Sequence, residues 1–356
     1  MNHRGALILP KSSNKLTLKD VAGILGVSDA TVSNAFNRPG QLSRELRKNI
    51  IERCKEIGYL GPNAISRNLK AGKTGIIGVM LSNYLSYSFS DEIAHQFLIG
   101  LAEVFEQREY NFLVMPSRDN VEMASGYESF VNGFIVYGPP QEQEIEHLVN
   151  LHKSIVTVDF DVEGYASVNV DNFTGARDCA LHAINGLESE NAIGILGLRI
   201  NDQNKICHID DGELFDEATI TIQRLRGYQS AANSSDRIIK YQDIWNVPDN
   251  TSQLGYEAAK EALSQTKGLK VLLCMSDRLA IGALKAAHDL GINVPEDLKI
   301  TGFDDISDSR YQQPALTTVR QKSNEKGKIA AEIFLGLREE KSVVLPADLV
   351  IRESCP

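Results

Sequence analysis

The chain has 356 residues, too many for a single hydrophobic core, so its length predicts two or three domains. No apolar run reaches the ~18 residues of a membrane span, and the apolar run near the N-terminus is too short for a secretion signal, so we expect a cytoplasmic protein. The five cysteines are odd in number and form no Cys-x-x-Cys pair, which argues against a disulfide framework or a zinc ribbon.

The net charge of −10 is divided unevenly along the chain. Residues 1–73 carry a net charge of +8, whereas residues 74–356 carry −18. A basic head on an acidic body directs the attraction for phosphate groups to one end of the protein and repels nucleic acid elsewhere. The acidic total is therefore compatible with a DNA-binding head.

Two short predicted helices, separated by a tight corner, open the basic head. Thr17 is the predicted N-cap of the first helix and Ser28 that of the second. Between them, Ala22 allows the helices to approach, Gly26 permits a left-handed corner, and Val32 fills the joint. This spacing is typical of a helix-turn-helix, whose second helix enters the major groove of DNA.

A third helix is predicted from a Ser43 N-cap to Gly58. We place a DNA-binding domain at residues 16–62, after a flexible tail at residues 1–15, and a short hinge helix at residues 63–73. The apolar residues expected to form the small core are Leu46, Ile50, Ile51, Cys54 and Ile57 with Val21, Leu25, Val32 and Phe36.

From Thr74 onward, strand-like runs alternate with amphipathic helical stretches, which is typical of an α/β fold with doubly wound parallel sheets. There are too many predicted strands for one ordinary sheet, so we expect two lobes. The polar, acidic stretch at residues 201–219 reads as an inserted surface loop. The long predicted helices cover residues 89–107, 174–187, 220–233, 251–264 and 277–290.

Taken in order, several motifs resemble those of the lac-repressor (LacI/GalR) family of bacterial transcription regulators. In the head these are Thr17-Leu-Lys-Asp-Val-Ala22, Gly26-Val-Ser-Asp-Ala-Thr-Val-Ser33 and Asn63-Ala-Ile-Ser-Arg-Asn-Leu-Lys70. In the body they are Arg224-Leu-Arg-Gly-Tyr228, Ser276-Asp-Arg-Leu-Ala-Ile-Gly282, Gly302-Phe-Asp-Asp305 and Pro314-Ala-Leu-Thr-Thr-Val-Arg-Gln321.

The resemblance implies an effector-binding core at residues 74–356 like that of periplasmic sugar-binding proteins. In that fold the chain crosses between two lobes three times. We place the first lobe at about 74–172 plus 307–335 and the second at about 173–306 plus 336–356.

On the predicted second helix, the resemblance places Asp29, Ala30 and Asn34 against base edges. Asparagine can bridge adenine, alanine can contact a thymine methyl, and aspartate can accept from cytosine N4. Asp29 can equally serve as a favourable charge at a helix N-terminus. The short polar residues suited to phosphate oxygens are Thr17, Ser28, Thr31, Ser33 and Asn37.

In the hinge, the resemblance implies that Leu69 wedges between base pairs in the minor groove and kinks the duplex. It further implies that Asn63, Ser66 and Lys70 line the groove or backbone beside this wedge.

Polar groups also follow several predicted strands, where ligands of parallel sheets gather. These groups include Asn83, Asp159, Ser276, Asp277 and Asp304, although Asp277 opens a helix and is equally a candidate cap. The resemblance adds Phe89 as a stacking platform, Arg224 as a two-pronged donor, and Asn250 at a position that often carries an aromatic. Carboxylates, an arginine and an aromatic face suit a sugar or nucleoside.

No Gly-x-Gly-x-x-Gly or Gly-x-Ser-x-Gly pattern occurs, so we expect neither an enzyme nor a bound cofactor or metal. The sequence predicts a DNA-binding regulator, a repressor gated by a small molecule, that acts as a homodimer on a pseudo-palindromic operator. The absence of a heptad tail favours a dimer over a tetramer. A regulator controlled by a protein partner and a transport solute-binding protein are the alternatives.

Overall fold

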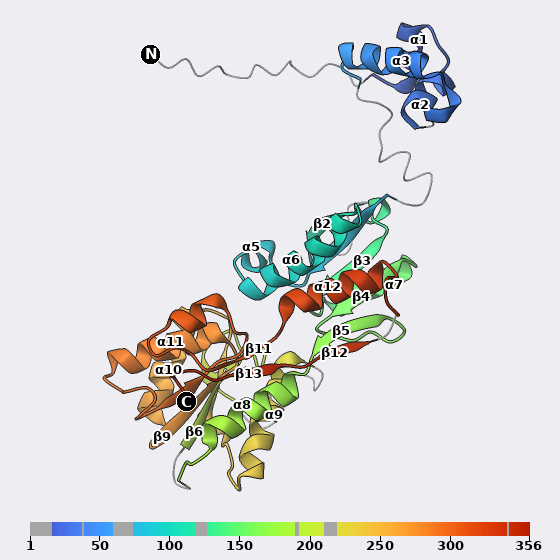
Figure 1. Ribbon diagram of the computed structural model, residues 1–356. Helices are drawn as coiled ribbons and strands as arrows, with labels where there is room; N and C mark the ends of the chain where they lie inside the picture. Colours follow the sequence, from blue (N-terminus) through green and yellow to red (C-terminus); the bar gives the residue numbers. More distant parts are fainter. Residues whose placement is uncertain are drawn as a thin grey trace, which may run out of the picture. The chain divides into compact units, whose positions relative to one another are not determined.

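The computed structural model describes residues 16–37, 39–59, 74–117, 127–188, 192–209, 219–339 and 342–356. The chain divides into two compact units, residues 1–75 and residues 76–356. Figure 1 shows the elements of each unit. The expected tail at residues 1–15 and the expected hinge helix at residues 63–73 lie outside the described residues.

The first unit is helical. Its elements are α1 (Leu18–Leu25), α2 (Asp29–Asn37), the 3-10 turn η1 (Pro39–Gln41) and α3 (Arg44–Glu56). A capping box begins α1, in which the Thr17 side chain accepts from the backbone of Asp20 while Asp20 accepts from the backbone of Thr17. Gly26 ends α1 with a φ of 68°, the left-handed conformation that the corner before α2 requires.

The core of the first unit lies between its three helices. Val32 and Cys54 are fully buried, and Ile50 is nearly so. Two expected core residues are not core: Leu46 is 42% exposed, and Ile51 is only half-buried. Leu46 lies on nearly the same face as Ile50 but in the first turn of α3, where its side chain stays exposed, and Ile51 lies about 100° around the helix from Ile50.

Two parallel sheets define two lobes in the second unit. The first lobe is built on a six-stranded sheet in the order β12-β5-β4-β3-β1-β2, and the second on a five-stranded sheet in the order β10-β9-β6-β8-β7. The first sheet contains β1 (Ile76–Leu81), β2 (Asn111–Pro116), β3 (Gly133–Tyr137), β4 (Ser154–Val158), β5 (Ala166–Val170) and β12 (Val343–Leu345). The second contains β6 (Ala192–Leu198), β7 (Cys207–His208), β8 (Ile244–Val247), β9 (Leu269–Cys274) and β10 (Lys299–Thr301).

Helices cover the sheets, as parallel strands with crossover connections require. In the first lobe α12 (Ser323–Phe334) packs against α6 (Glu92–Gln107); in the second, α8 (Asn172–Ile184) packs against α9 (Ile220–Ser234), and α10 (Ser252–Gln265) against α11 (Asp277–Asp289). The shorter helices are α5 (Leu85–Ser88), η3 (Tyr127–Phe130), α7 (Glu142–Asn150), η4 (Tyr241–Asp243) and η5 (Ser307–Tyr311).

The α6–α12 crossing depends on glycine. A Cβ added at Gly327 would lie 2.2 Å from the Phe97 carbonyl oxygen, so only glycine allows this close approach of the two helices. Across the described residues, none of the helices has both the length and the hydrophobicity that crossing a lipid bilayer requires.

The chain crosses between the lobes at different residues from those expected. Strand β12 pairs with β5 in the first sheet, although residues 336–356 were expected in the second lobe. Conversely, Leu316 and Val319 are buried in the apolar clusters of the second lobe, although residues 307–335 were expected in the first. Burial of these apolar side chains ties β11 (Thr318–Arg320) and its antiparallel partner β13 (Asp348–Val350) to the second lobe.

The stretch 201–219 is not simply a surface loop. Within it, β7 pairs antiparallel with β8, and Ile209 is 1% exposed in the core of the second lobe. Strand β8 was not predicted, because a run of four residues is too short for periodicity to show. Its Trp245 is fully buried. Residues 210–218 lie outside the described part of the chain.

Candidate functional sites

Helix α2 presents a short polar face beside a buried one. Val32 and Ala35 are fully buried, whereas Asp29 and Ala30 are exposed and Asn34 is half-buried. Residues at these positions lie on neighbouring turns of one helix face, because 3.6 residues complete a turn. The structure therefore leaves the three residues expected to contact base edges available on α2.

Side-chain hydrogen bonds fix the start of α2 and its position on α3. The Ser28 hydroxyl oxygen accepts from the Thr31 backbone N–H at 3.1 Å, and the Ser28 and Thr31 hydroxyls are 2.8 Å apart. At the other end, Arg47 Nε of α3 donates to the Ala35 carbonyl oxygen at 2.9 Å. These bonds hold α2 at a set orientation on the small core, which reading base edges requires.

Thr17, like Ser28 and Thr31, has a structural role besides the expected contact with a phosphate. Thr17 Oγ1 donates to Asp20 Oδ2 at 2.6 Å, and the hydrogen bonds from Thr17 lower the pKa of Asp20. Ser33 lies half-buried on α2. The side chain of Asn37 and all of Asn63, Ser66, Leu69 and Lys70 lie outside the described part of the structure.

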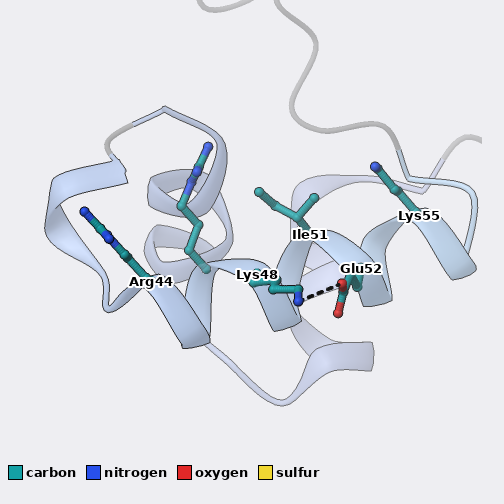
Figure 2. A pocket seen from close by; sticks show the side chains of 6 residues that line it. Arg44, Lys48, Ile51, Glu52 and Lys55 are labelled. Carbon is teal, nitrogen blue, oxygen red and sulfur yellow. Dashed lines mark ion pairs between the residues drawn. The ribbon is translucent and has the colours of Figure 1, made fainter.

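Helix α3 adds a basic groove that sequence reasoning did not predict. Figure 2 shows the side chains along this groove, with Lys48 Nζ 3.9 Å from Glu52 Oε1 in an exposed ion pair. The residues that line it are Arg44, Arg47, Lys48, Ile51, Glu52 and Lys55. The periodicity of the sequence predicts only the buried face of this helix, although the spacing of its cations is also visible there.

In the second unit, carboxylates from distant parts of the chain act electrostatically on Tyr137. Burial raises the pKa of the Tyr137 hydroxyl well above its usual value, and the negative charges of Asp159, Asp91 and Asp304 raise it further. Asp159 follows β4, and Asp304 lies just beyond β10. Carboxyl ends of strands from both sheets thus contribute to one polar cluster.

Asp159 is held by a buried lysine. Lys326 Nζ donates to the two carboxylate oxygens of Asp159 at 2.8 and 2.6 Å, and the two side chains are 0% and 5% exposed. The ammonium also lies 5.3 Å from the centroid of the Tyr137 ring. Sequence reasoning missed Lys326, because it lies 167 positions away on α12.

Arg224 is the arginine that the second lobe contributes to this polar cluster. Its Nε donates to Asn172 Oδ1 at 2.9 Å, and its Nη1 donates to the Met275 carbonyl oxygen at 2.5 Å. The guanidinium carbon lies 3.6 Å from the centroid of the Phe303 ring. The two hydrogen bonds and the ring contact fix the plane of the guanidinium. The guanidinium is therefore already oriented before a ligand binds.

Asp304 lies beside Arg224, with 3.6 Å between Asp304 Oδ1 and Arg224 Nη1. Burial raises the pKa of Asp304 to about 8, although Arg224 and a hydrogen bond from Gln321 lower it. The residue adopts a φ of 125°, a backbone region that residues other than glycine rarely occupy. Burial therefore favours the protonated form of this carboxyl, which can donate as well as accept.

Asp277 is fully buried and its oxygen atoms are already engaged. The Ile306 backbone N–H donates to it at 2.9 Å, the Ser309 hydroxyl at 2.6 Å, and the Thr318 hydroxyl also donates to it. Burial raises the pKa of Asp277 to about 6 against these hydrogen bonds. A direct contact with a ligand would cost one of these bonds.

Asn250 and Ser276 are brought together, since Ser276 Oγ donates to Asn250 Oδ1 at 2.5 Å. The Tyr87 hydroxyl also hydrogen-bonds to Asn250, and burial raises the pKa of Tyr87 to about 12. Phe89 is 50% exposed, and Asn83 is exposed as well. Tyr87, two positions before Phe89, is thus the aromatic that meets the polar cluster, whereas the sequence analysis had proposed only Phe89.

Comparisons with known proteins match both units. Residues 17–63 match the profile described as bacterial regulatory proteins, lacI family, and residues 204–355 match that of a periplasmic binding protein-like domain. An HTH-type transcriptional regulator of Mycobacterium tuberculosis is 30% identical over 339 residues, which cover 92% of each chain.

Two solved structures share the fold. The lac repressor dimer bound to operator and the anti-inducer ONPF has a TM-score of 0.74 at 21% identity, covering 96% of this chain and 99% of that chain. The transcriptional regulator CelR in a cellobiose complex has a TM-score of 0.67 at 22% identity, covering 95% and 99%.

Proposed function

The chain belongs to the lacI family of bacterial regulatory proteins. From this premise we propose that it is a transcriptional repressor whose affinity for operator DNA is controlled by a small molecule. The observation that carries the proposal is the pairing of a positively charged helix-turn-helix unit with a two-lobed unit that gathers buried polar groups from both lobes.

At the DNA end, Asp29, Ala30 and Asn34 of α2 would meet base edges in the major groove, while Thr17, Ser28, Thr31, Ser33 and Asn37 would contact phosphates. In the expected hinge, which lies outside the described residues, Leu69 would act as a minor-groove wedge flanked by Asn63, Ser66 and Lys70. Two such heads, one from each chain of a homodimer, would read a pseudo-palindromic operator. The solved lac repressor, a dimer bound to operator, supports this arrangement.

At the effector end, Arg224, Asp304, Asn250, Ser276 and Asp159 would face a polyhydroxylated ligand. Fixed donors and acceptors of this kind recognise hydroxyl groups, and the arginine can donate to two oxygens at once. The neutral carboxyl of Asp304 would donate to a ring oxygen or accept from a hydroxyl. The cellobiose complex of a structure with this fold supports a sugar, and nucleosides share the same chemistry.

Control would follow from a population shift between two arrangements of the lobes. A ligand shifts this balance only by the difference between its affinities for the two arrangements. Because linkage is reciprocal, a ligand that weakens operator binding must itself bind more weakly in the presence of operator.

The proposal is tested by selecting bound duplexes from random DNA with the full chain, and by measuring shifts of the melting temperature across a panel of sugars and nucleosides. We expect one palindromic sequence to be enriched and at least one compound to raise the melting temperature. Failure to enrich any sequence would contradict the DNA function. Enrichment without any thermal shift would favour control by a protein partner.

A further inference from the structure

One short stretch of the first lobe reaches the second lobe at several points. We call residues 87–92 the strap; it runs from the end of α5 into the first residue of α6. Asp91 ends the loop as the N-cap of α6, and its side chain accepts from the Ala94 backbone N–H at 3.1 Å. The strap is therefore anchored to the first lobe by the helix that follows it.

Arg278 of α11 makes the first contact from the second lobe. Its Nη2 donates to the Ser90 carbonyl oxygen and lies 4.0 Å from Asp91 Oδ1. The guanidinium carbon lies 6.0 Å from the centroid of the Tyr87 ring. The Arg278 side chain is 25% exposed, so its contacts are partly shielded from water.

Glu92 makes the second contact, in the opposite direction. Its Oε1 accepts from the Ser307 backbone N–H at 2.9 Å and from the Ser307 hydroxyl at 2.7 Å, and its Oε2 lies 3.0 Å from the same N–H. Ser307 begins η5, which is tied to the second lobe because the Ser309 hydroxyl donates to the buried Asp277. A carboxylate at a helical N-terminus is also favoured by the backbone dipoles.

We propose that Arg278 and Glu92 form a two-point latch that positions the strap on the second lobe and thereby favours the closed arrangement of the lobes. With the latch in place, the Tyr87 hydroxyl forms a hydrogen bond with the Asn250 side chain, and Asn250 Oδ1 accepts a hydrogen bond from Ser276 Oγ. Arg278 supplies a cation to the first lobe and Glu92 supplies an anion to the second, so opening must break both contacts. The consequence for operator binding rests on the proposed function.

The latch is tested by measuring the distance between the lobes with paired spin labels. Glu106→Cys on α6 and Lys267→Cys after α10 place one label on each lobe, since both residues are exposed. The half-exposed Cys207 is replaced by serine, and the other four cysteines are buried. Labelled chains are diluted with an excess of unlabelled chain, so that distances within one chain dominate the signal.

We expect Arg278→Ala and Glu92→Ala each to add a population at longer distance, and Glu92→Gln, which keeps one acceptor oxygen, to add less of it. The matched control is Arg177→Ala, which removes an arginine that pairs with Asp178 at 2.9 Å within α8 of the second lobe. This control should leave the distance distribution unchanged. Distributions for Arg278→Ala and Glu92→Ala that match the parent protein would overturn the latch.

A titration of the selected operator duplex separates this proposal from the function on which it draws. If the latch variants open the lobes and no duplex is bound selectively, the latch stands and the repressor proposal fails. If selective binding is found and the distance distribution does not respond to either variant, the repressor proposal stands and the latch fails. A merely structural role would lower the melting temperature without adding a longer distance.

Discussion

The two units of this chain use polar residues in opposite ways. In the first unit, Asp29, Ala30 and Asn34 come from one helix and remain accessible on its surface. In the second, Asp159, Arg224 and Asp304 come from distant parts of the chain and are almost fully enclosed by partners. A surface for DNA can be built from neighbouring residues, whereas a site for a small molecule must be assembled by the fold.

The comparison predicts that substitutions of the buried polar residues in the second unit cost stability, while those of the base-facing residues on α2 cost binding alone. The largest effect is expected for Lys326→Met, which leaves the Asp159 carboxylate buried without its cation. Removing one partner of a buried pair costs roughly 3–5 kcal/mol. Urea unfolding followed by circular dichroism measures this loss.

Two variants control this measurement. Lys328→Met removes an exposed lysine of the same helix that pairs with Glu103, and should cost at most about 1 kcal/mol. Asp159→Asn added to Lys326→Met should recover part of the loss, because it removes the buried carboxylate that has lost its cation. Asparagine also tolerates the left-handed φ of 67° at this position. Equal losses from both lysines would show that burial of the Lys326–Asp159 pair does not determine its cost.

Leu69→Ala is the corresponding large effect at the DNA end. If this leucine wedges between base pairs, its loss should weaken operator binding by a few kcal/mol, while the melting temperature stays within about 1 °C. A gel-shift titration beside a thermal scan separates the two effects. A large drop in melting temperature with unchanged affinity would assign Leu69 to a core instead.

A smaller effect is expected for Asn34→Ala. Loss of an asparagine that bridges adenine should reduce discrimination at one base pair by about 1–3 kcal/mol and leave the other positions unchanged. Repeating the duplex selection with this variant measures the change. An unaltered base preference at every position would show that Asn34 does not read a base edge.

The last prediction concerns pH and the second unit alone. Because burial raises the pKa of Asp304 to about 8, the folded state binds a proton that the unfolded chain has already released above pH 4. This contribution to stability is therefore fully present below about pH 4 and is lost as the pH rises through 8, by at most about 1.4 kcal/mol per pH unit.

The single tryptophan, Trp245, is buried in the same lobe and reports this unfolding by fluorescence. Asp304→Asn should flatten the dependence between pH 6 and 8.5, whereas the exposed Asp202→Asn should not. A stability that rises over this range would contradict the buried, protonated carboxyl.

Local patterns predicted the first unit well. Helix caps and corners depend on residues that are close together in the sequence, here Thr17, Ser43 and Gly26. The helices begin and end at these residues or next to them. The error at Leu46 and Ile51 arose because periodicity identifies an apolar face but not how far the neighbouring helices extend along it.

The second unit was predictable only in part. Strands such as β1 and β9 could be read from their apolar runs, but β8 was too short, and β12 joins the first sheet through a pairing 175 residues away in sequence at Val343 and Val168. Lys326, Tyr87, Arg278 and Glu92 escaped notice for the same reason. Their partners are fixed by tertiary structure, and no spacing along the chain reveals them.

The most direct test of the central claim is a fluorescence-anisotropy titration of the full chain on its selected duplex and on a scrambled duplex, at two salt concentrations. The account predicts preference for the selected duplex by at least 10³-fold at moderate salt, weaker binding to both as salt rises, and a change in affinity on adding a compound that shifts the melting temperature. Equal affinity for the two duplexes, with or without such compounds, would contradict it.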